Sequence, residues 1–451
     1  MDMEKRVYNR LTTDYNLHDM PNLIKITGGN PLVGEVTLSG AKNAATKMMI
    51  ASILTSEPVT LHNCPRIGDV DITAELCRAI GTKVSFDGST VHLHTPKIIQ
   101  TTVKHLSQAN RISVLAIPPL LHRAGNASVP KVSGDKIGPR PVNYHLDSLI
   151  KMGAKIEETN KGYKAKASRL HGTSVTLPYP SVGSTENIIL SAVLADGRTY
   201  IKNAAIEPEI MDLIKMLQQM GAIIEFRANR TIIIDGVEKL SGVEYSVMAD
   251  RNEAASYGVM AVATGGDILV KGARQEDLMT FLNTLRRIGA DYFIEPDGIR
   301  FRRTSAALTG VELETDTYPG FMTDWQQPMV VLLTQAEGIS VIHETVYEER
   351  FGYVETLKNM GASVTVFAKC LGELPCRFNG EGYKHSAVIK GPTPLHATTI
   401  VIPDIRAGMA QVIAALIAEG TSELTGLEHL LRGYENLLDK LHAIGAQFEA
   451  K

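Results

Sequence analysis

The sequence contains the stretch Lys151-Met152-Gly153-Ala154-Lys155-Ile156, in which an amphipathic run ends at a glycine and a strand-like run follows. Glycine is favoured just past a helix end because that position usually has a positive φ angle. The pattern recurs roughly every 70 residues, at residues 79–84, 151–156, 219–224, 287–290, 359–362 and 443–446. The chain is therefore expected to consist of one large supersecondary unit repeated six times.

Each repeated unit begins with an apolar helix rich in small residues, as at 44–54, 187–194 and 409–418. A short strand, the amphipathic helix that ends in the glycine stretch, and one or two further strands complete the unit. Helical periodicity that alternates with short β-rich runs indicates an α/β fold. Because the first helix of each unit is apolar on every side, we expect it to be buried on every side, with helices inside and sheets outside.

Six units predict two domains, because three units are enough for one compact core and 451 residues are too many for a single one. We expect residues 42–248 to form the first barrel domain. The last repeat stops short after Glu449, and residues 23–41 can supply the missing strands. We therefore expect residues 23–41 and 249–451 to form the second barrel domain together, and residues 1–22 to be an N-terminal extension.

The composition is that of an ordinary globular chain, with 44% hydrophobic residues, 21% charged residues and a formal net charge of −3. This charge gives no attraction toward nucleic acid or an anionic membrane. No uncharged apolar run reaches the roughly 18 to 20 residues that span a bilayer, and residues 1–21 lack the apolar core of a signal peptide. We expect a cytoplasmic protein without nucleic-acid or membrane partners, while its oligomeric state stays open.

The sequence predicts neither a metal nor an organic cofactor. His343, His385 and His429 lie far apart in the chain, which favours core or surface roles over metal binding. There is no P-loop and no Gly-x-Gly-x-x-Gly after a strand, so nucleotide binding of those types is unsupported. Four cysteines occur at spacings that suit neither a disulfide framework nor a zinc site, so buried reduced thiols are expected: Cys64, Cys77, Cys370 and Cys376.

Polar and charged side chains gather just before, or in the first turn of, the apolar helices. Helix N-termini present free N–H groups and a positive dipole end, so lysine or arginine there opposes the usual preference and points to an anionic ligand. Ordinary capping is the simpler explanation for Ser184, Thr323 and Asp404 taken singly. As a set these helix starts favour a polyanionic ligand: Lys42, Asn43, Arg111, Ser184, Arg251, Thr323, Asp324, Asp404 and Arg406.

Two further stretches carry charge at informative places. Residues 132–141 interrupt the second repeat, and their two glycines and two prolines indicate a shaped loop. Asp135 and Arg140 in this loop favour a lid over a charged substrate, although an exposed loop with solvated charges is an equally good interpretation. Arg432 opens the last amphipathic helix, and Arg350 holds the matching place in the fifth repeat.

At these residues the sequence resembles the enolpyruvyl transferases, over nearly the whole chain from Leu23 onward. The motifs that carry the resemblance are highly specific together, and they lie at 39–45 (Ser-Gly-Ala-Lys-Asn-Ala-Ala), 134–141, 181–187, 323–324, 404–408 and 432–435. The resemblance implies two inside-out α/β barrels of three repeats each. It also implies transfer of the enolpyruvyl group of phosphoenolpyruvate to the 3-hydroxyl of UDP-N-acetylglucosamine, with release of phosphate, in peptidoglycan synthesis and without a cofactor.

The resemblance further implies roles for single residues. Asp324 takes the proton from the sugar hydroxyl, and Asp135 or Lys42 delivers a proton to C3 of phosphoenolpyruvate. The residues expected to bind phosphoenolpyruvate, whose two anionic groups require several fixed cations, are Lys42, Asn43, Arg111, Arg140, Arg406 and Arg432. Those expected to bind the nucleotide sugar are Arg140, Pro141, Val142, Asn143, Ser181, Val182, Gly183, Asp324, Val346 and Arg350.

The chain departs from the usual family pattern at Asn143 and Leu431, its residues 1–21 have no counterpart in typical members, and Asp135 is the less common of two family variants. Asp135 stands at the lid position that is cysteine in most members and aspartate in some, and this cysteine is the residue that fosfomycin alkylates. Asn143 stands where an aspartate is usual beside the uracil, and Leu431 replaces a common aspartate. These departures leave another nucleotide or sugar-nucleotide acceptor open, whereas shikimate 3-phosphate is disfavoured by the uridine-loop motif. A non-catalytic repeat scaffold is the remaining alternative, but it has no need of the clustered cations.

Overall fold

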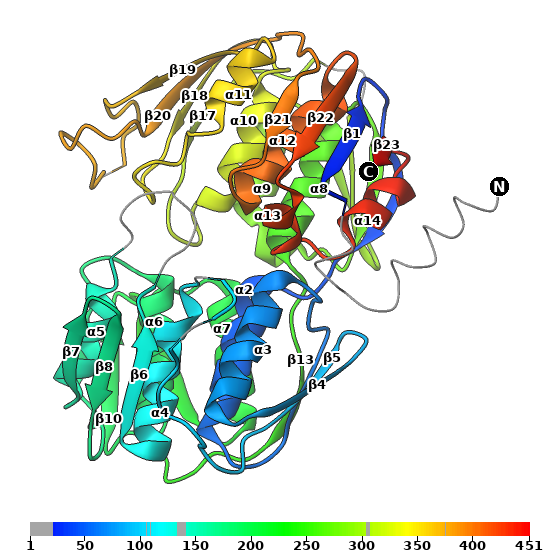
Figure 1. The fold of residues 1–451 in the computed structure, drawn as a ribbon. Coiled ribbons are helices and arrows are strands. Elements are labelled where there is room, and N and C mark those ends of the chain that lie inside the picture. Colours follow the sequence, from blue (N-terminus) through cyan, green and yellow to red (C-terminus); the bar gives the residue numbers. More distant parts are fainter. Residues whose placement is uncertain (1–20, 105, 109, 133–140, 304–306, 375) are drawn as a thin grey trace.

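The computed structural model describes residues 21–451 except 105, 109, 133–140, 304–306 and 375. Two separate hydrophobic cores give the chain two lobes (Figure 1). One core takes its residues from between Ala41 and Val247. The other combines residues of the segment 24–38 with residues of the segment 254–446. Residues 1–20, most of the expected N-terminal extension, lie outside the described residues.

The first lobe has one sheet for each of its three repeats. The first sheet has the order β13-β3-β5-β4, made of β3 (Val59–His62), β4 (Lys83–Asp87), β5 (Thr90–His94) and β13 (Val243–Ser246). The second, β6-β8-β7, is made of β6 (Asn126–Pro130), β7 (Lys155–Thr159) and β8 (Gly162–Lys166). The third, β11-β12-β10-β9, is made of β9 (Ser174–Thr176), β10 (Arg198–Lys202), β11 (Ile223–Arg227) and β12 (Thr231–Asp235). Because β13 pairs in parallel with β3, the end of the lobe returns to its beginning.

The second lobe repeats this plan with four-stranded sheets. Its first sheet, β15-β16-β14-β2, contains β2 (Val33–Thr37), β14 (Asp267–Lys271), β15 (Asp291–Glu295) and β16 (Gly298–Arg302). Its second, β17-β18-β20-β19, contains β17 (Glu312–Glu314), β18 (Gly338–His343), β19 (Ser363–Phe367) and β20 (Ser386–Gly391). Its third, β21-β22-β1-β23, contains β1 (Leu23–Thr27), β21 (Thr399–Val401), β22 (Thr421–Thr425) and β23 (Gln447–Ala450).

Apolar helices fill the centre of each lobe. Every residue of α8 and of α10 is buried, as the all-round apolar pattern predicts. In the second lobe α8, α10 and α12 pack against one another, with the sheets outside them (Figure 1). The inner helices are α2 (Lys42–Ala51), α4 (Ile117–Ala124), α6 (Val182–Ala192), α8 (Arg251–Ala263), α10 (Gln326–Leu333) and α12 (Ile405–Ile417). Short 3-10 turns extend some of them: η2 (Ser52–Leu54), η3 (Ile112–Ala116) and η4 (Thr323–Trp325).

The six predicted helix ends are confirmed. The glycines that follow the amphipathic helices, Gly81, Gly153, Gly221, Gly289, Gly361 and Gly445, all have φ between 82° and 119°, a region that residues with a side chain adopt at a cost. The helices concerned are α3 (Gly68–Ile80), α5 (Asn143–Lys151), α7 (Pro208–Gln219), α9 (Gln275–Arg287), α11 (Val354–Asn359) and α14 (Leu437–Ala443). A short helix, α13 (Leu427–Leu431), precedes α14. The repeat found in the sequence is thus a repeat of structure.

The N-terminal strands belong to the second core. Strand β1 lies between β22 and β23, so it completes the last repeat, and β2 pairs in parallel with β14. Gly40 and Ala249 form an isolated antiparallel bridge, which places the two passages of chain between the lobes side by side. These pairings support, as a proposal, a first domain at 42–248 and a second at 23–41 plus 249–451.

Two histidines that looked isolated in the sequence lie together in the fold. The rings of His343, at the end of β18, and His385, just before β20, have centroids 5.5 Å apart. The sequence interpretation of single, separate histidines is wrong here, because the ladder between β18 and β20 sets His343 opposite Ser386. None of the helices in the described part of the chain is long and apolar enough to cross a membrane.

Candidate active site

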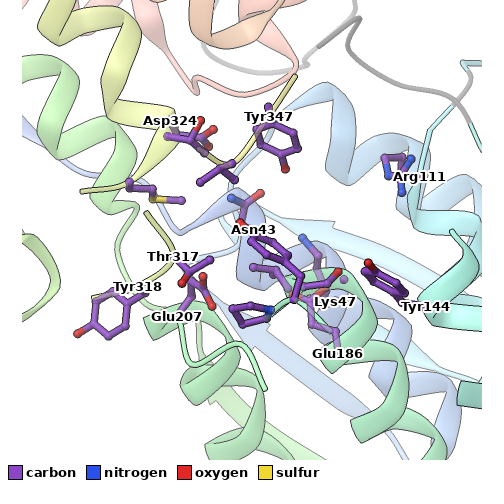
Figure 2. A pocket seen from close by; sticks show the side chains of 18 of the residues that line it. Asn43, Lys47, Arg111, Tyr144, Glu186, Glu207, Thr317, Tyr318, Asp324 and Tyr347 are labelled. Carbon is purple, nitrogen blue, oxygen red and sulfur yellow. The ribbon is translucent and has the colours of Figure 1, made fainter. Parts of the chain in front are cut away.

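A cavity of about 440 Å³ lies between the two lobes. The first lobe contributes the starts of α2 and α6 together with Pro141 and residues 143–145 and 179–183. The second lobe contributes residues 316–324, residues 346–348 and Arg432. Side chains from both lobes point toward the same space, including Asn43, Lys47 and Glu186 from one and Asp324 and Tyr347 from the other (Figure 2).

Helix starts around this cavity differ in how their N–H groups are satisfied. Asp404 caps α12 (Ile405–Ile417) by accepting from the N–H groups of Arg406 and Ala407, at 2.9 and 3.0 Å. At α6 the cap is Ser181, whose hydroxyl accepts from the N–H of Ser184 at 3.4 Å, so the expectation that Ser184 is the cap is corrected. Thr323 is no cap either, because its hydroxyl donates to the buried carboxyl of Glu344 at 2.9 Å.

Asp324 is a buried carboxylate held between two arginines. Arg350 donates to one of its oxygens at 2.5 Å, and Arg406 donates to the other at 3.1 Å. Burial opposes ionisation, but the charges of Arg406, Arg350 and Lys42 outweigh burial and hold the pKa of Asp324 well below its usual value. The group is therefore an anion at neutral pH, placed where η4 meets the cavity.

Asp69 is a second buried carboxylate at the cavity, and unlike Asp324 it bridges the two lobes. The Asp69 carboxylate lies 2.9 Å from the Nζ of Lys42 at the start of α2, and it accepts from Nη2 and Nε of Arg432 at 3.0 and 3.1 Å. Burial opposes ionisation of Asp69, yet the charges of Lys42 and Arg432 lower its pKa. Asp69 thus brings together two cations from different lobes. Its single negative charge neutralises only one of their two positive charges.

The opposite wall of the cavity belongs to α5, α6 and a loop of the second lobe. Gly183 packs so closely on His145 that a Cβ at Gly183 would lie 3.1 Å from the imidazole ring. Burial lowers the pKa of His145 to about 3, so this ring is neutral. Arg377 of the second lobe lies 4.1 Å above the ring of Tyr179 and donates to the carbonyl of Val346 at 2.7 Å. Residues of both lobes thus meet at this part of the cavity wall.

The sequence and the two-lobed fold of this chain are both similar to those of known proteins. A family profile described as "EPSP synthase (3-phosphoshikimate 1-carboxyvinyltransferase)" matches residues 26–441. The chain belongs to this family of enolpyruvyl transferases. It is therefore an enzyme, and the inside-out double barrel implied by the sequence resemblance is confirmed as its fold.

Relatives of this enolpyruvyl transferase match it over almost their whole length. A protein of Protochlamydia amoebophila called UDP-N-acetylglucosamine 1-carboxyvinyltransferase is 49% identical over 438 residues, covering 94% of this chain and 93% of the relative. One of the same name from Chlamydia pneumoniae is 48% identical, covering 95% and 94%. The solved structure of the enolpyruvyl transferase NikO from Streptomyces tendae has a TM-score of 0.84 at 24% identity, covering 96% and 99%, which is a likeness of fold.

Most of the site residues predicted from the sequence are brought together in this enolpyruvyl transferase. The cavity is lined by Lys42, Asn43, Arg111, Pro141, Asn143, Ser181, Val182, Gly183, Asp324, Val346 and Arg432. Val142 is buried away from the described lining, and Arg350 and Arg406 are buried beside Asp324 and hold it rather than line the cavity. Asp135 and Arg140 lie outside the described residues.

Sequence reasoning missed several residues that shape the cavity. Asp69 follows a glycine at the start of α3. Acidic residues are common in the first turn of a helix because they interact favourably with the helix dipole, so nothing in the sequence set Asp69 apart. Glu186 was noted within a motif but was given no role, although it lines the cavity and is only 1% exposed. Burial, mainly, raises its pKa to about 7. Arg377 and Tyr179 meet across the lobes, which only the fold reveals.

Proposed function

We propose that this enolpyruvyl transferase moves the enolpyruvyl group of phosphoenolpyruvate to the 3-hydroxyl of UDP-N-acetylglucosamine and releases inorganic phosphate, the first committed step of peptidoglycan synthesis. The observation that carries the proposal is a single interlobe cavity that holds Lys42 and Arg432, the Asp324 carboxylate and the Ser181–Gly183 turn together. The names of relatives that are 48 to 49% identical support this acceptor. A cytoplasmic location belongs to the proposal.

Lys42 and Arg432 are proposed to bind phosphoenolpyruvate together with Asn43 and Arg111, which also line the cavity. Both cations already face an anion, because Asp69 lies at 2.9 and 3.0 Å from them. A phosphate or carboxylate of the substrate adds charge-assisted hydrogen bonds to donors that Asp69 has oriented in advance. Arg406 and Arg140 complete the proposed set, and Arg140 keeps its role from the sequence resemblance alone.

Asp324 is proposed to take the proton of the sugar 3-hydroxyl as that oxygen attacks C2 of phosphoenolpyruvate. Its two arginine partners keep it ionised, which a base requires, but they also make it a weak base. Movement of Arg406 toward the phosphoenolpyruvate carboxylate would remove one of these partners and strengthen the base when both substrates are present. Asp135 or Lys42 supplies the proton to C3, and the resulting tetrahedral adduct then loses phosphate together with a C3 proton, which restores the carbon–carbon double bond of the enolpyruvyl group.

The nucleotide is proposed to lie along the wall formed by Pro141–Asn143, Ser181–Gly183 and Val346. The N–H groups and the positive dipole end at the start of α6 suit a diphosphate. Asn143 lines the cavity, so its amide in place of the usual aspartate bears on which base is accepted. Transfer to another nucleotide or sugar-nucleotide is for this reason the second candidate, whereas family membership argues against a non-catalytic scaffold.

A phosphate-release assay with phosphoenolpyruvate and a panel of acceptors tests the proposal. UDP-N-acetylglucosamine, other uridine and non-uridine nucleotide sugars, and shikimate 3-phosphate are compared at equal concentration. The proposal expects UDP-N-acetylglucosamine to give the highest kcat/KM. A higher value with a different nucleotide sugar would establish the second candidate, and phosphate release with shikimate 3-phosphate alone would refute both.

A further inference from the structure

Four side chains of metal-binding type lie together in the second lobe, away from the cavity. They are His343, Cys370, Cys376 and His385, and each offers one nitrogen or sulfur atom within 4.8 Å of the other three. Both histidines are completely buried, and the two cysteines are partly buried. The Sγ of Cys370 is already 3.3 Å from Nε2 of His385. A tetrahedral zinc with two sulfur and two nitrogen ligands sets its ligand atoms about 3.3 to 3.8 Å apart, so no pair of these atoms has to approach by more than about 1.5 Å.

Both imidazole rings are oriented with Nε2 toward this cluster. Nδ1 of His385 is 2.6 Å from the carbonyl of Tyr383, and Nδ1 of His343 is 2.7 Å from the carboxylate of Glu314. Each Nδ1 therefore carries the proton and each Nε2 offers a lone pair. Nε2 of His343 is buried without any hydrogen-bond partner among the described residues. A buried nitrogen of this kind is costly unless a ligand satisfies it, and a carboxylate or carbonyl on the remote nitrogen is the usual support of a metal-binding histidine.

The backbone around Glu314 is built to keep that support in place. The N–H groups of Glu373 and Leu374 donate to the two Glu314 oxygens at 2.8 and 3.0 Å. Gly372 leaves the room required, because a Cβ there would lie 2.1 Å from a Glu314 oxygen and 2.5 Å from Nδ1 of His343. Gly372, Glu314 and His343 are thus closely packed and hydrogen-bonded to one another, and such packing is not required in an ordinary surface loop.

Three of the four side chains come from one unusually long connection. In the other hairpins of the same kind, the turns consist only of residues 88–89, 160–161, 228–230 and 296–297. Between β19 and β20 the connection runs from residue 368 to residue 385, and it contains Cys370, Cys376 and His385. A loop of this length has little apolar core of its own, so a metal crosslink to His343 on β18 is an effective way to order it.

We propose that His343, Cys370, Cys376 and His385 bind a structural Zn²⁺ ion that fastens the 368–385 loop to β18. Two thiolates and two imidazoles in a closed set of four suit tetrahedral Zn²⁺ better than Mg²⁺ or Ca²⁺, which prefer oxygen ligands. Binding converts the two thiols to thiolates and releases two protons to solvent, with no change in oxidation state. This proposal departs from the sequence expectation of no metal, because only the fold brings His343 of β18 next to the three side chains of the 368–385 loop.

The loop also reaches the interlobe cavity, which gives the ion a consequence beyond stability. Arg377 is the residue after Cys376, and it is the side chain that stacks on Tyr179 and donates to the carbonyl of Val346. An ion bound to Cys376 therefore restricts the backbone from which Arg377 extends. Removal of the ion is expected to free Arg377 from the cavity wall while the distant Lys42 and Asp69 cluster stays intact.

Metal analysis of the full-length protein, purified without added chelator, tests the proposal directly. One equivalent of zinc per chain is expected, and replacement by Co²⁺ should give the visible absorption of a tetrahedral site together with thiolate charge-transfer bands. Cys370→Ser and Cys376→Ser should each lose the metal and the spectrum. The matched control is the double variant Cys64→Ala with Cys77→Ala, which removes the two cysteines buried in the first lobe. This variant should keep the metal and the spectrum.

A second readout does not depend on metal content in the purified sample. Trypsin has three target residues in the loop, Lys369, Arg377 and Lys384, and cleavage there should become at least about tenfold faster when the ion is removed by a chelator. Zinc retained in both cysteine variants, or no zinc and no tetrahedral cobalt spectrum in the unmodified protein supplied with either metal, would overturn the proposal. A Cys370–Cys376 disulfide in protein isolated under reducing conditions would overturn it as well.

Discussion

At Asp324 the protein keeps a carboxylate ionised by surrounding it with positive charge. Two arginines, at 2.5 and 3.1 Å, more than offset the burial of the group. This arrangement explains why Arg350 and Arg406 are buried although both are charged. The same contacts mean that the proposed base is weak until a substrate draws one arginine away, which ties proton transfer to substrate binding.

Asp324→Asn is expected to lower kcat by about 10² to 10⁴-fold, because an amide cannot accept the proton of the sugar hydroxyl. Asparagine keeps one oxygen for the arginines, so the protein should still fold, with a lower melting temperature. Phosphate release measures the turnover of Asp324→Asn and of the unmodified enzyme. Circular dichroism, recorded below the melting temperature of each, shows whether both are folded. Asp87→Asn, an exposed position on β4, is the control. Turnover by Asp324→Asn within threefold of the unmodified enzyme would remove Asp324 from the mechanism.

Asp135 gives a prediction that rests on sequence, since it lies outside the described residues. A carboxylate is a much weaker nucleophile toward an epoxide than a thiolate, so fosfomycin should leave the enzyme active after long preincubation. Asp135→Cys should introduce time-dependent inactivation and a covalent mass increase on that residue. Rapid inactivation of the unmodified enzyme, with a drug adduct on a different side chain, would show that Asp135 is not at the lid position.

Helix α6 combines a binding turn at its start with an unusual acid one turn later. Glu186 is buried, and one of its oxygens has no hydrogen-bond partner among the described residues. Burial, opposed by Lys47 and assisted by Glu209 and Glu207, raises its pKa to about 7. The folded state therefore holds this proton more tightly than the unfolded state, so its contribution to stability is complete at low pH and is lost as the pH rises toward 7.

Glu186→Gln should remove this loss of stability. Relative to the unmodified protein, the variant should gain up to about 3 kcal/mol in the free energy of unfolding as the pH rises from about 4.5 to 7.5. Urea unfolding at several pH values measures the difference, and Glu225→Gln on the exposed face of β11 is the control. A difference between Glu186→Gln and the unmodified protein that does not change with pH would contradict the assigned ionisation.

Helices and their ends could be predicted from the sequence where a local conformational rule determines the residue type. Site residues could be predicted where they belong to a recognisable motif. The six glycines were found because a left-handed helix end excludes most other residues, and the buried helices because they are apolar all round. Asp69 was missed because an acid at a helix start is commonplace, and its role comes from Arg432 of the other lobe. His343 and His385 were misjudged because only the register of β18 on β20 brings them together.

At the scale of the whole molecule, a buried ion pair fastens the two lobes beside the cavity. Arg251 at the start of α8 donates twice to Glu209 of α7, at 3.0 Å each, and both side chains are almost fully buried. The Arg251 guanidinium also lies near the rings of Trp325 and Tyr318. A second contact joins the lobes where Arg230 donates to the carbonyl of Tyr318. Such contacts couple the unfolding of one lobe to that of the other.

Glu209→Gln should lower stability by about 3 to 5 kcal/mol, because it leaves the Arg251 charge buried and unpaired. Calorimetry should then show the two lobes melting in separate transitions. The double variant Glu209→Gln with Arg251→Met removes the stranded charge and should recover most of the stability. A single, unshifted transition in Glu209→Gln would mean that this ion pair does not couple the lobes.

The interlobe cavity is proposed to join phosphoenolpyruvate to the 3-hydroxyl of UDP-N-acetylglucosamine. Mass spectrometry of the products, run beside phosphate release, tests this proposal most directly, with the 3-deoxy analogue of the nucleotide sugar as the matched control. One enolpyruvyl ether is expected for each phosphate released with UDP-N-acetylglucosamine, and neither product is expected with the 3-deoxy analogue. Phosphate release that continues with the 3-deoxy analogue, or the absence of any enolpyruvyl nucleotide sugar, would contradict the proposal.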